Sequence, residues 1–131
     1  MLIEILSSTH DLTTLLFGIY ISAFFLGVRQ NLKNIGILFL LFCGEGLTYL
    51  LFSLTISDAF ARQIYPLIIH LPLAFFLHLY YKYPLLSSFT SVFSAYLCCQ
   101  VSTWIGLFVL DLTGQDLCYY SARIAATILT F

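Results

Sequence analysis

Long stretches without an ionised side chain divide this sequence into segments that match the thickness of a membrane. Residues 12–28, 63–81 and 83–110 form uncharged stretches of 17, 19 and 28 residues, and the 24 residues of 34–57 hold one charge, Glu45. A helix crosses a hydrocarbon core of about 30 Å with about 20 residues. Each stretch exceeds the roughly 9 to 11 residues of a barrel strand and lacks polar alternation, so we expect helices.

The composition excludes a water-soluble globular domain. Apolar residues make up 61% of the 131 residues and charged residues 8%, whereas soluble domains carry about 25% charged residues. The lipid bilayer is therefore the expected partner. The net charge of -1 leaves no basic surface, so no nucleic-acid partner is expected.

The expected fold is an all-α, polytopic membrane helical bundle that forms one domain over residues 1–131. The predicted helices are 12–28, 35–56, 63–81, 85–109 and 117–131. The fifth stops at Phe131 before a full crossing and without a basic anchor, so we expect the chain to be the leading part of a longer protein. Glu4 and Asp11, with no basic residue near them, argue against a cleavable signal peptide.

The basic residues of the loops indicate the orientation. The first loop holds Arg29 and Lys33 and the third holds Lys82, whereas the second holds Arg62 and the fourth has only acidic residues. Basic residues favour cytoplasmic loops. The odd loops are therefore predicted to be cytoplasmic and the N-terminus extracellular.

Glu45 is predicted to lie near the bilayer midplane, in the middle of the second helix. An ionised group there costs about 2.5 to 3.5 kcal/mol, so Glu45 should face protein or water, and burial favours its neutral form unless a cation lies beside it. Gly44 and Gly46 would let a neighbouring helix approach closely. Two readings stay open: a structural hydrogen-bonding role, and a role in binding a signal, an ion or a substrate.

Arg123 and His70 are the candidate partners of Glu45. Arg123 can reach inward from the fifth helix or extend to the outer interface. His70 lies between Pro66 and Pro72, which free backbone carbonyls and bend a helix. We therefore expect a hinge or an opened cavity there. For His70 itself, a hydrogen-bonded neutral imidazole is the commoner case, and a metal ligand or a proton carrier is the alternative. His10 and His78 are placed toward opposite interfaces.

Two side-chain stripes run along the fourth helix at intervals of four residues. The small-residue stripe, suited to close helix packing, is Ser87, Ser91, Ala95, Cys99 and Thr103. The other stripe is Tyr96, Gln100 and Trp104. These side chains can either form contacts between helices or contact a ligand.

Aromatic residues and one arginine gather toward the predicted outer half of the membrane. They can form either a pocket for an apolar or anionic ligand, such as a peptide carboxylate, or an ordinary interfacial belt. These residues are Tyr49, Tyr65, Trp104, Tyr119, Tyr120 and Arg123.

Local spacing supports no catalytic or cofactor site. Cys98 and Cys99 are adjacent without a histidine four residues away, and Gly44-Glu45-Gly46 lacks the lysine of a phosphate-binding loop. No Cys–His spacing indicates a peptidase, and free thiols are expected. We therefore expect no metal, no cofactor and no enzymatic activity within these residues.

Two segments carry a family resemblance. Residues 65–72 (Tyr-Pro-Leu-Ile-Ile-His-Leu-Pro) and 94–100 (Ser-Ala-Tyr-Leu-Cys-Cys-Gln), followed by Trp104-Ile105-Gly106, resemble the N-terminal membrane region of GHKL-type sensor histidine kinases of gut Firmicutes, relatives of the accessory-gene-regulator peptide receptors. The resemblance covers the third to fifth predicted helices.

The resemblance implies a multi-pass sensor of a two-component system. Such a protein receives an extracellular signal, for which a peptide is one candidate, and relays it by helix rearrangement to a cytoplasmic kinase absent from this chain, within a homodimer. His70 and His78 lie in predicted spanning helices, so neither corresponds to the phosphorylated histidine. Two alternatives stay open: a small transporter component that holds a polar solute with Glu45 and Arg123, and a membrane cysteine peptidase.

Overall fold

Helices make up every regular element of the part of the chain that the structure describes. The structure is a computed structural model that describes residues 2–130, and the side chains of all of these except 2–4, 58, 59, 62 and 130. The predicted all-α class is confirmed for these residues. The elements are α1 (Leu2–Phe25), α2 (Leu32–Thr55), α3 (Asp58–Gln63), the π-helix η1 (Pro66–His70), α4 (Leu71–Tyr81), α5 (Leu85–Thr113) and α6 (Asp116–Thr130).

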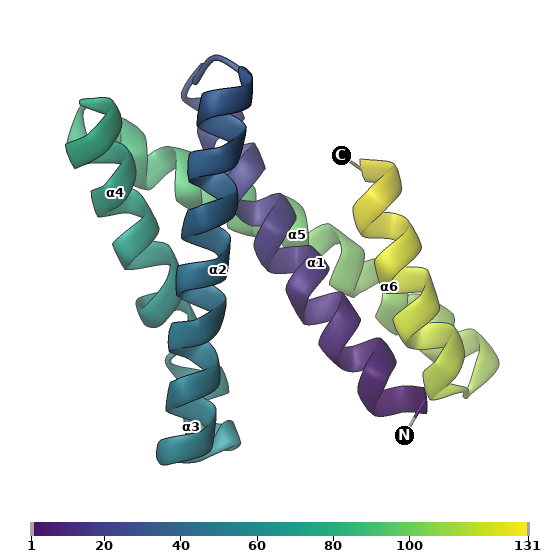
Figure 1. The fold of residues 1–131 in the computed structure, drawn as a ribbon. Coiled ribbons are helices and arrows are strands. Elements are labelled where there is room, and N and C mark those ends of the chain that lie inside the picture. The colour runs from purple at the N-terminus through teal and green to yellow at the C-terminus, as the bar shows by residue number, and fades with distance from the viewer. Residues whose placement is uncertain (1, 131) are drawn as a thin grey trace.

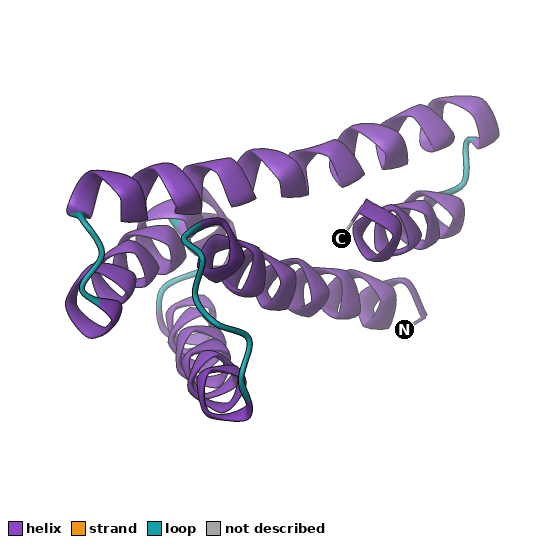
Figure 2. Cartoon of the chain, turned by 90° about the horizontal axis from the view of Figure 1, so that it is seen from above, coloured by secondary structure: helices purple, strands orange, loops and turns teal. Residues whose placement is uncertain are grey.

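Helices α1 and α5 cross near the centre of the fold, and the other helices pack around them (Figure 1). α5 contacts α1, α4 and α6, while α2 contacts α1, α3 and η1. Figure 2 shows α5 running along one side of the molecule, with α6 near one of its ends. In Figure 1 the α1–α2 and α4–α5 connections lie at the top, whereas α3 and the α5–α6 turn lie at the bottom.

Small residues line the crossing of α1 and α5. The buried Ser91 hydroxyl of α5 donates a hydrogen bond to the Ser22 carbonyl of α1. Ala23, which follows Ser22 on α1, and Ala95, which lies four residues after Ser91 on α5, are also buried. Small side chains let helix backbones approach closely, and a hydroxyl can then bond across the interface. The packing predicted for the small-residue stripe is confirmed at Ser91, which contacts α1, whereas Ser87 is exposed.

The structure corrects several helix boundaries. The first helix, predicted as 12–28, already begins at Leu2 and ends at Phe25, before Gly27 at φ 76°. The second, predicted as 35–56, begins at Leu32 because the Asn31 side chain caps it by accepting from the Asn34 amide at 2.8 Å. The fourth, predicted as 85–109, runs to Thr113, where Gly114 ends it at φ 64°.

The third predicted helix, 63–81, is not continuous, and the fifth agrees closely with its prediction. α3 ends at Gln63, η1 spans Pro66–His70, and α4 follows directly. α6 begins at Asp116, one residue before the predicted 117, and the predicted end at Phe131 lies outside the described residues.

Two of the helices, α2 and α5, are long and apolar enough to cross a membrane. The segment Pro66–Tyr81 is apolar but shorter. Five crossings and an extracellular N-terminus therefore stay predictions. The apolar core between the helices is formed by Leu15, Ile19, Ala23, Val28, Leu38, Ile69, Leu73, Ala74, Leu77 and Val92.

Candidate functional site

Glu45 is buried in the bundle. α2 places it against the rest of the fold with 6% of its surface exposed, and neither carboxyl oxygen has a hydrogen-bond partner among the residues that the structure describes. Buried polar groups are normally bonded, so an orphaned carboxyl is an exception that needs an explanation. The predicted burial of Glu45 is confirmed, and the partner that the sequence leads us to expect is not found.

The close helix approach predicted at Gly44 and Gly46 is not found at Gly44, and at Gly46 it amounts to an ordinary contact with α1. A Cβ atom at Gly44 would meet nothing within 4 Å, and one at Gly46 would make an ordinary 3.8 Å contact with Leu15 of α1. Gly106 of α5 is a position where the packing depends on the absence of a side chain, and the sequence pattern did not predict this close contact. There a Cβ would lie 2.2 Å from Cγ of Arg123.

A row of four rings connects three elements beside Glu45. We call Tyr49, Tyr65, His70 and Tyr96 the ring row. Neighbouring rings meet edge to face, with centroid distances of 5.5 Å (Tyr49–Tyr65), 5.7 Å (Tyr65–His70) and 4.9 Å (His70–Tyr96). Such pairs are favourable beyond their buried area. The row joins α2 to the π-helix and the π-helix to α5.

Tyr65 brings the ring row next to several polar groups. It lies within electrostatic range of Glu45, of Asp11 on α1 and of Cys99 on α5. The neighbour of Asp11, His10, is 2% exposed, and its ring nitrogens lie 3.3 Å from the Asp11 carboxylate and 3.3 Å from the Thr14 hydroxyl. The position predicted for His10, toward one membrane interface, stays a prediction. Its contact with Thr14 agrees with their spacing of four residues along the helix.

The π-helix holds His70 in the ring row and has a local cause. Proline lacks an N–H and its ring clashes with the carbonyl four residues earlier in an α-helix. For Pro72 that carbonyl belongs to Ile68, within η1, and the wider π-turn relieves the contact. At the other end, the Ile64 carbonyl accepts from the amides of both Leu67 (2.9 Å) and Ile68 (3.0 Å). An irregularity between Pro66 and Pro72, predicted as a hinge, is present as a π-helix. π-turns recur at functional sites.

Arg123 forms a separate polar site between α5 and α6. Its guanidinium donates to the Tyr119 hydroxyl at 2.8 Å and to the Thr103 hydroxyl at 3.0 Å, and lies 5.0 Å from the centre of the Tyr119 ring. Neither of these bonds goes to Glu45, because both of its carboxyl oxygens are unbonded. The structure does not join the two residues that the transporter interpretation requires in one solute site.

The second predicted stripe of α5 is divided between different environments. Tyr96 joins the ring row, Gln100 is half-buried, and Trp104 is 71% exposed. Steps of four residues rotate about 40° around a helix, so Tyr96 and Trp104 point about 80° apart. The aromatic pocket predicted to include Trp104 with Tyr49 and Tyr65 is not assembled by the described residues.

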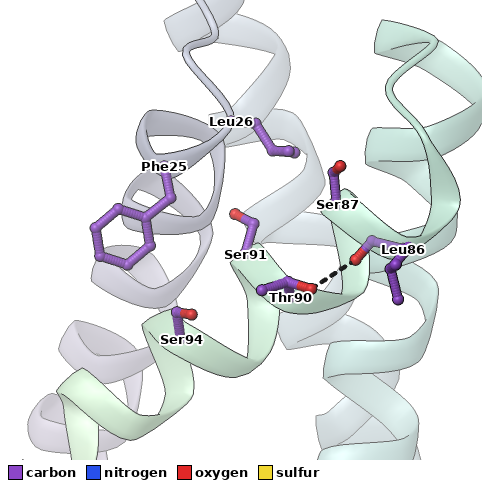
Figure 3. A pocket seen from close by; sticks show the side chains of 7 residues that line it. All are labelled: Phe25, Leu26, Leu86, Ser87, Thr90, Ser91 and Ser94. Carbon is purple, nitrogen blue, oxygen red and sulfur yellow. Dashed lines mark hydrogen bonds between the residues drawn. The ribbon is translucent and has the colours of Figure 1, made fainter.

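Two cavities open between the helices. One, of about 320 Å³, adjoins the π-helix and is lined by Gln63, Ile64, Pro66, Leu67, His70, Leu71, Phe89 and Phe93. The other, of about 410 Å³, lies between the end of α1 and the start of α5 and is lined by Phe25, Leu26, Leu86, Ser87, Thr90, Ser91 and Ser94 (Figure 3). The Thr90 hydroxyl in it donates to the Leu86 carbonyl at 2.8 Å.

Within the described residues, no three His, Cys, Asp or Glu side chains are grouped so that they could hold a metal ion. Cys43, Cys98, Cys99 and Cys118 are free thiols. Comparison of the chain with protein-family models, with curated proteins and with solved structures finds no match. The resemblance to sensor kinases therefore remains a prediction from the residues.

Proposed function

We propose that this chain is the membrane-embedded sensor domain of a two-component histidine kinase, with its N-terminus outside the cell. The observation that carries the proposal is the junction of α2, the π-helix and α5. There an unbonded, buried carboxyl adjoins a row of rings that spans all three elements. Buried polar groups are normally bonded, so an unbonded one needs an explanation, and an ionisable side chain inside a membrane is by default a candidate for a functional role.

The membrane part of the proposal is supported by the exposed side chains. Soluble monomers rarely expose large contiguous apolar patches, and here large apolar residues are more than half exposed along both α2 and α5. Examples are Leu32, Leu40, Leu54, Leu86, Leu97, Trp104 and Phe108. In a bilayer these side chains would contact lipid. The alternating direction of the helices in Figure 1 also suits repeated crossings.

The proposed mechanism is a shift between two arrangements of the π-helix. An extracellular signal that binds one arrangement more tightly would shift the population toward it. The ring row would carry the movement from α2 to α5, and α5 to the packed α6. A short peptide is the candidate signal and a homodimer the functional unit, by resemblance to the family.

Site-directed labelling of full-length chain in intact cells tests the topology. Single cysteines at Gln30 and Tyr83 should react with a membrane-impermeant maleimide only after the cells are opened. Cysteines at Ser57 and Gln115 should react from outside. The native cysteines are replaced in all four variants, and the cysteine-free chain is the control. Labelling of Gln30 and Gln115 from the same side would refute the proposed arrangement.

The genomic DNA that follows codon 131 tests the kinase part. A reading frame that continues into a dimerisation helix and an ATP-binding domain supports the proposal, and a stop codon directly after Phe131 contradicts it. In a continuing protein, Glu45→Gln should change signal-dependent autophosphorylation. Unchanged signalling by a stably inserted variant would exclude Glu45 from the sensing site.

A further inference from the structure

We propose that Glu45 is a buried proton-binding site that exchanges its proton with the cavity beside the π-helix by way of His70. The inference rests on the proposed placement of α2 in the membrane, and not on the kinase or on the identity of the signal. The site's ligand is the proton, because a carboxyl group can accept it without any additional space.

The surroundings of Glu45 supply no permanent cation among the described side chains. The titratable groups of this junction are placed by their contacts or electrostatic interactions with Tyr65: Glu45 and Tyr49 on α2, His70 on the π-helix, Asp11 with its neighbour His10 on α1, and Cys99 on α5. Arg123 is occupied by Tyr119 and Thr103. The side chain of Arg62 lies outside the described residues.

An ionised Glu45 would therefore be a buried charge without a hydrogen bond or a counter-ion. Such a charge is far more costly than a buried neutral acid, and groups in this situation take up a proton instead. The neutral acid is the form that this arrangement accommodates.

His70 offers a path for the proton. Its side chain lines the cavity of about 320 Å³, its Nε2 atom is buried without a hydrogen-bond partner among the described residues, and its ring contacts Tyr65, which lies within electrostatic range of Glu45. A neutral imidazole accepts a proton at one nitrogen and releases one from the other. In the proposed step the O–H bond of Glu45 breaks, one nitrogen of His70 gains that proton, and the other nitrogen gives a proton to water in the cavity.

The sequence offers an unusually direct experiment, because Glu4 and Glu45 are the glutamates of the chain. We would incorporate glutamate with a ¹³C-labelled side-chain carboxyl into Glu4→Gln protein in lipid bilayers and record infrared spectra against unlabelled protein. The labelled band then comes from Glu45. We expect a protonated-acid band at neutral pH, where a solvated glutamate, with a pKa of about 4.3, is ionised. A carboxylate band alone at neutral pH would overturn the proposal.

The exchange path is tested on the same sample. Transfer into D₂O shifts the band of the protonated acid as deuterium replaces hydrogen, and the rate of that shift measures exchange. We expect His70→Asn to slow it by about tenfold or more. The matched control is His78→Asn, which removes an imidazole that bonds the Tyr83 carbonyl at 2.7 Å and does not line the cavity. An unchanged rate in His70→Asn would refute the path through His70.

Failure of this proposal can be told apart from failure of the proposed function. Labelling of the loops reports the membrane topology, and autophosphorylation reports the kinase. A topology that holds together with an ionised Glu45 would refute only the proton site. If Glu45 is protonated in the labelled protein and the Glu45→Gln variant signals normally, the proton site is retained and is excluded from sensing.

Discussion

The contact between α5 and α6 depends on the absence of a side chain at Gly106, and Gly106→Ala tests it. An added Cβ would lie 2.2 Å from Cγ and 2.9 Å from Cδ of Arg123, and 3.2 Å from Cδ2 of Tyr119. The Arg123 side chain cannot simply swing away, because its guanidinium is bonded to Tyr119 and Thr103. The two helices must therefore move apart or the bonds must break.

The expected cost follows from three contributions. Overpacking costs about 1 to 3 kcal/mol, and the loss of an interhelical hydrogen bond in a membrane protein costs about 0.6 kcal/mol. Alanine regains about 1 kcal/mol over glycine in a helix. The free energy of unfolding of Gly106→Ala should therefore fall by about 0.6 to 2.6 kcal/mol, roughly a 3- to 70-fold change in the equilibrium constant.

Unfolding of the purified chain by SDS in mixed micelles measures this change, with the fluorescence of Trp104, the one tryptophan, and circular dichroism as probes. Gly44→Ala is the matched control, because a Cβ there meets nothing within 4 Å. This control should be as stable as the wild type or up to about 1 kcal/mol more stable. If Gly106→Ala is as stable as Gly44→Ala, the close packing of α6 against α5 is wrong.

Two further substitutions test the crossing and the π-helix. Ser91→Leu places a large side chain where the Ser91 hydroxyl contacts Ser22, so it should destabilise the chain by about 1 to 3 kcal/mol in the same SDS titration; wild-type stability would argue against the α1–α5 crossing. Pro72→Ala removes the proline that favours the π-turn, so Tyr96 and His70 should separate. Nuclear Overhauser contacts between their rings measure this, and unchanged contacts would show that Pro72 is not the cause.

The sequence predicted the helices better than their junctions. The long stretches with few or no charges located α2 and α5 to within a few residues, because length and apolarity are properties of each segment alone, and the start of α6 was predicted to within one residue. The prolines at 66 and 72 also indicated an irregular third helix. The extent of α1 was missed, since the polar residues His10 and Asp11 interrupt the apolar run without interrupting the helix.

The sequence predicted several of the residues that form the candidate site, but it did not predict which of them contact one another. Glu45, His70 and Tyr96 were each singled out, and the structure places them around one junction. Tyr65 as the ring that lies beside Glu45, and Gly106 as the close contact, were not foreseen in these roles. Both depend on which helix lies beside which, and helical spacing along one segment does not contain that information.

The sequence by itself determined that the described residues form helices, and its low content of charged residues predicts a lipid environment, because the hydrogen bonding of the backbone and the burial of charge are governed by composition and by length along the chain. The tertiary structure alone decided that Arg123 bonds across α5 and α6 while Glu45 stays unbonded beside the ring row. The physical reason is that a buried charge is stabilised only by groups within a few ångströms of it. Which groups those are is settled by the crossing of α1 and α5 and by the π-turn.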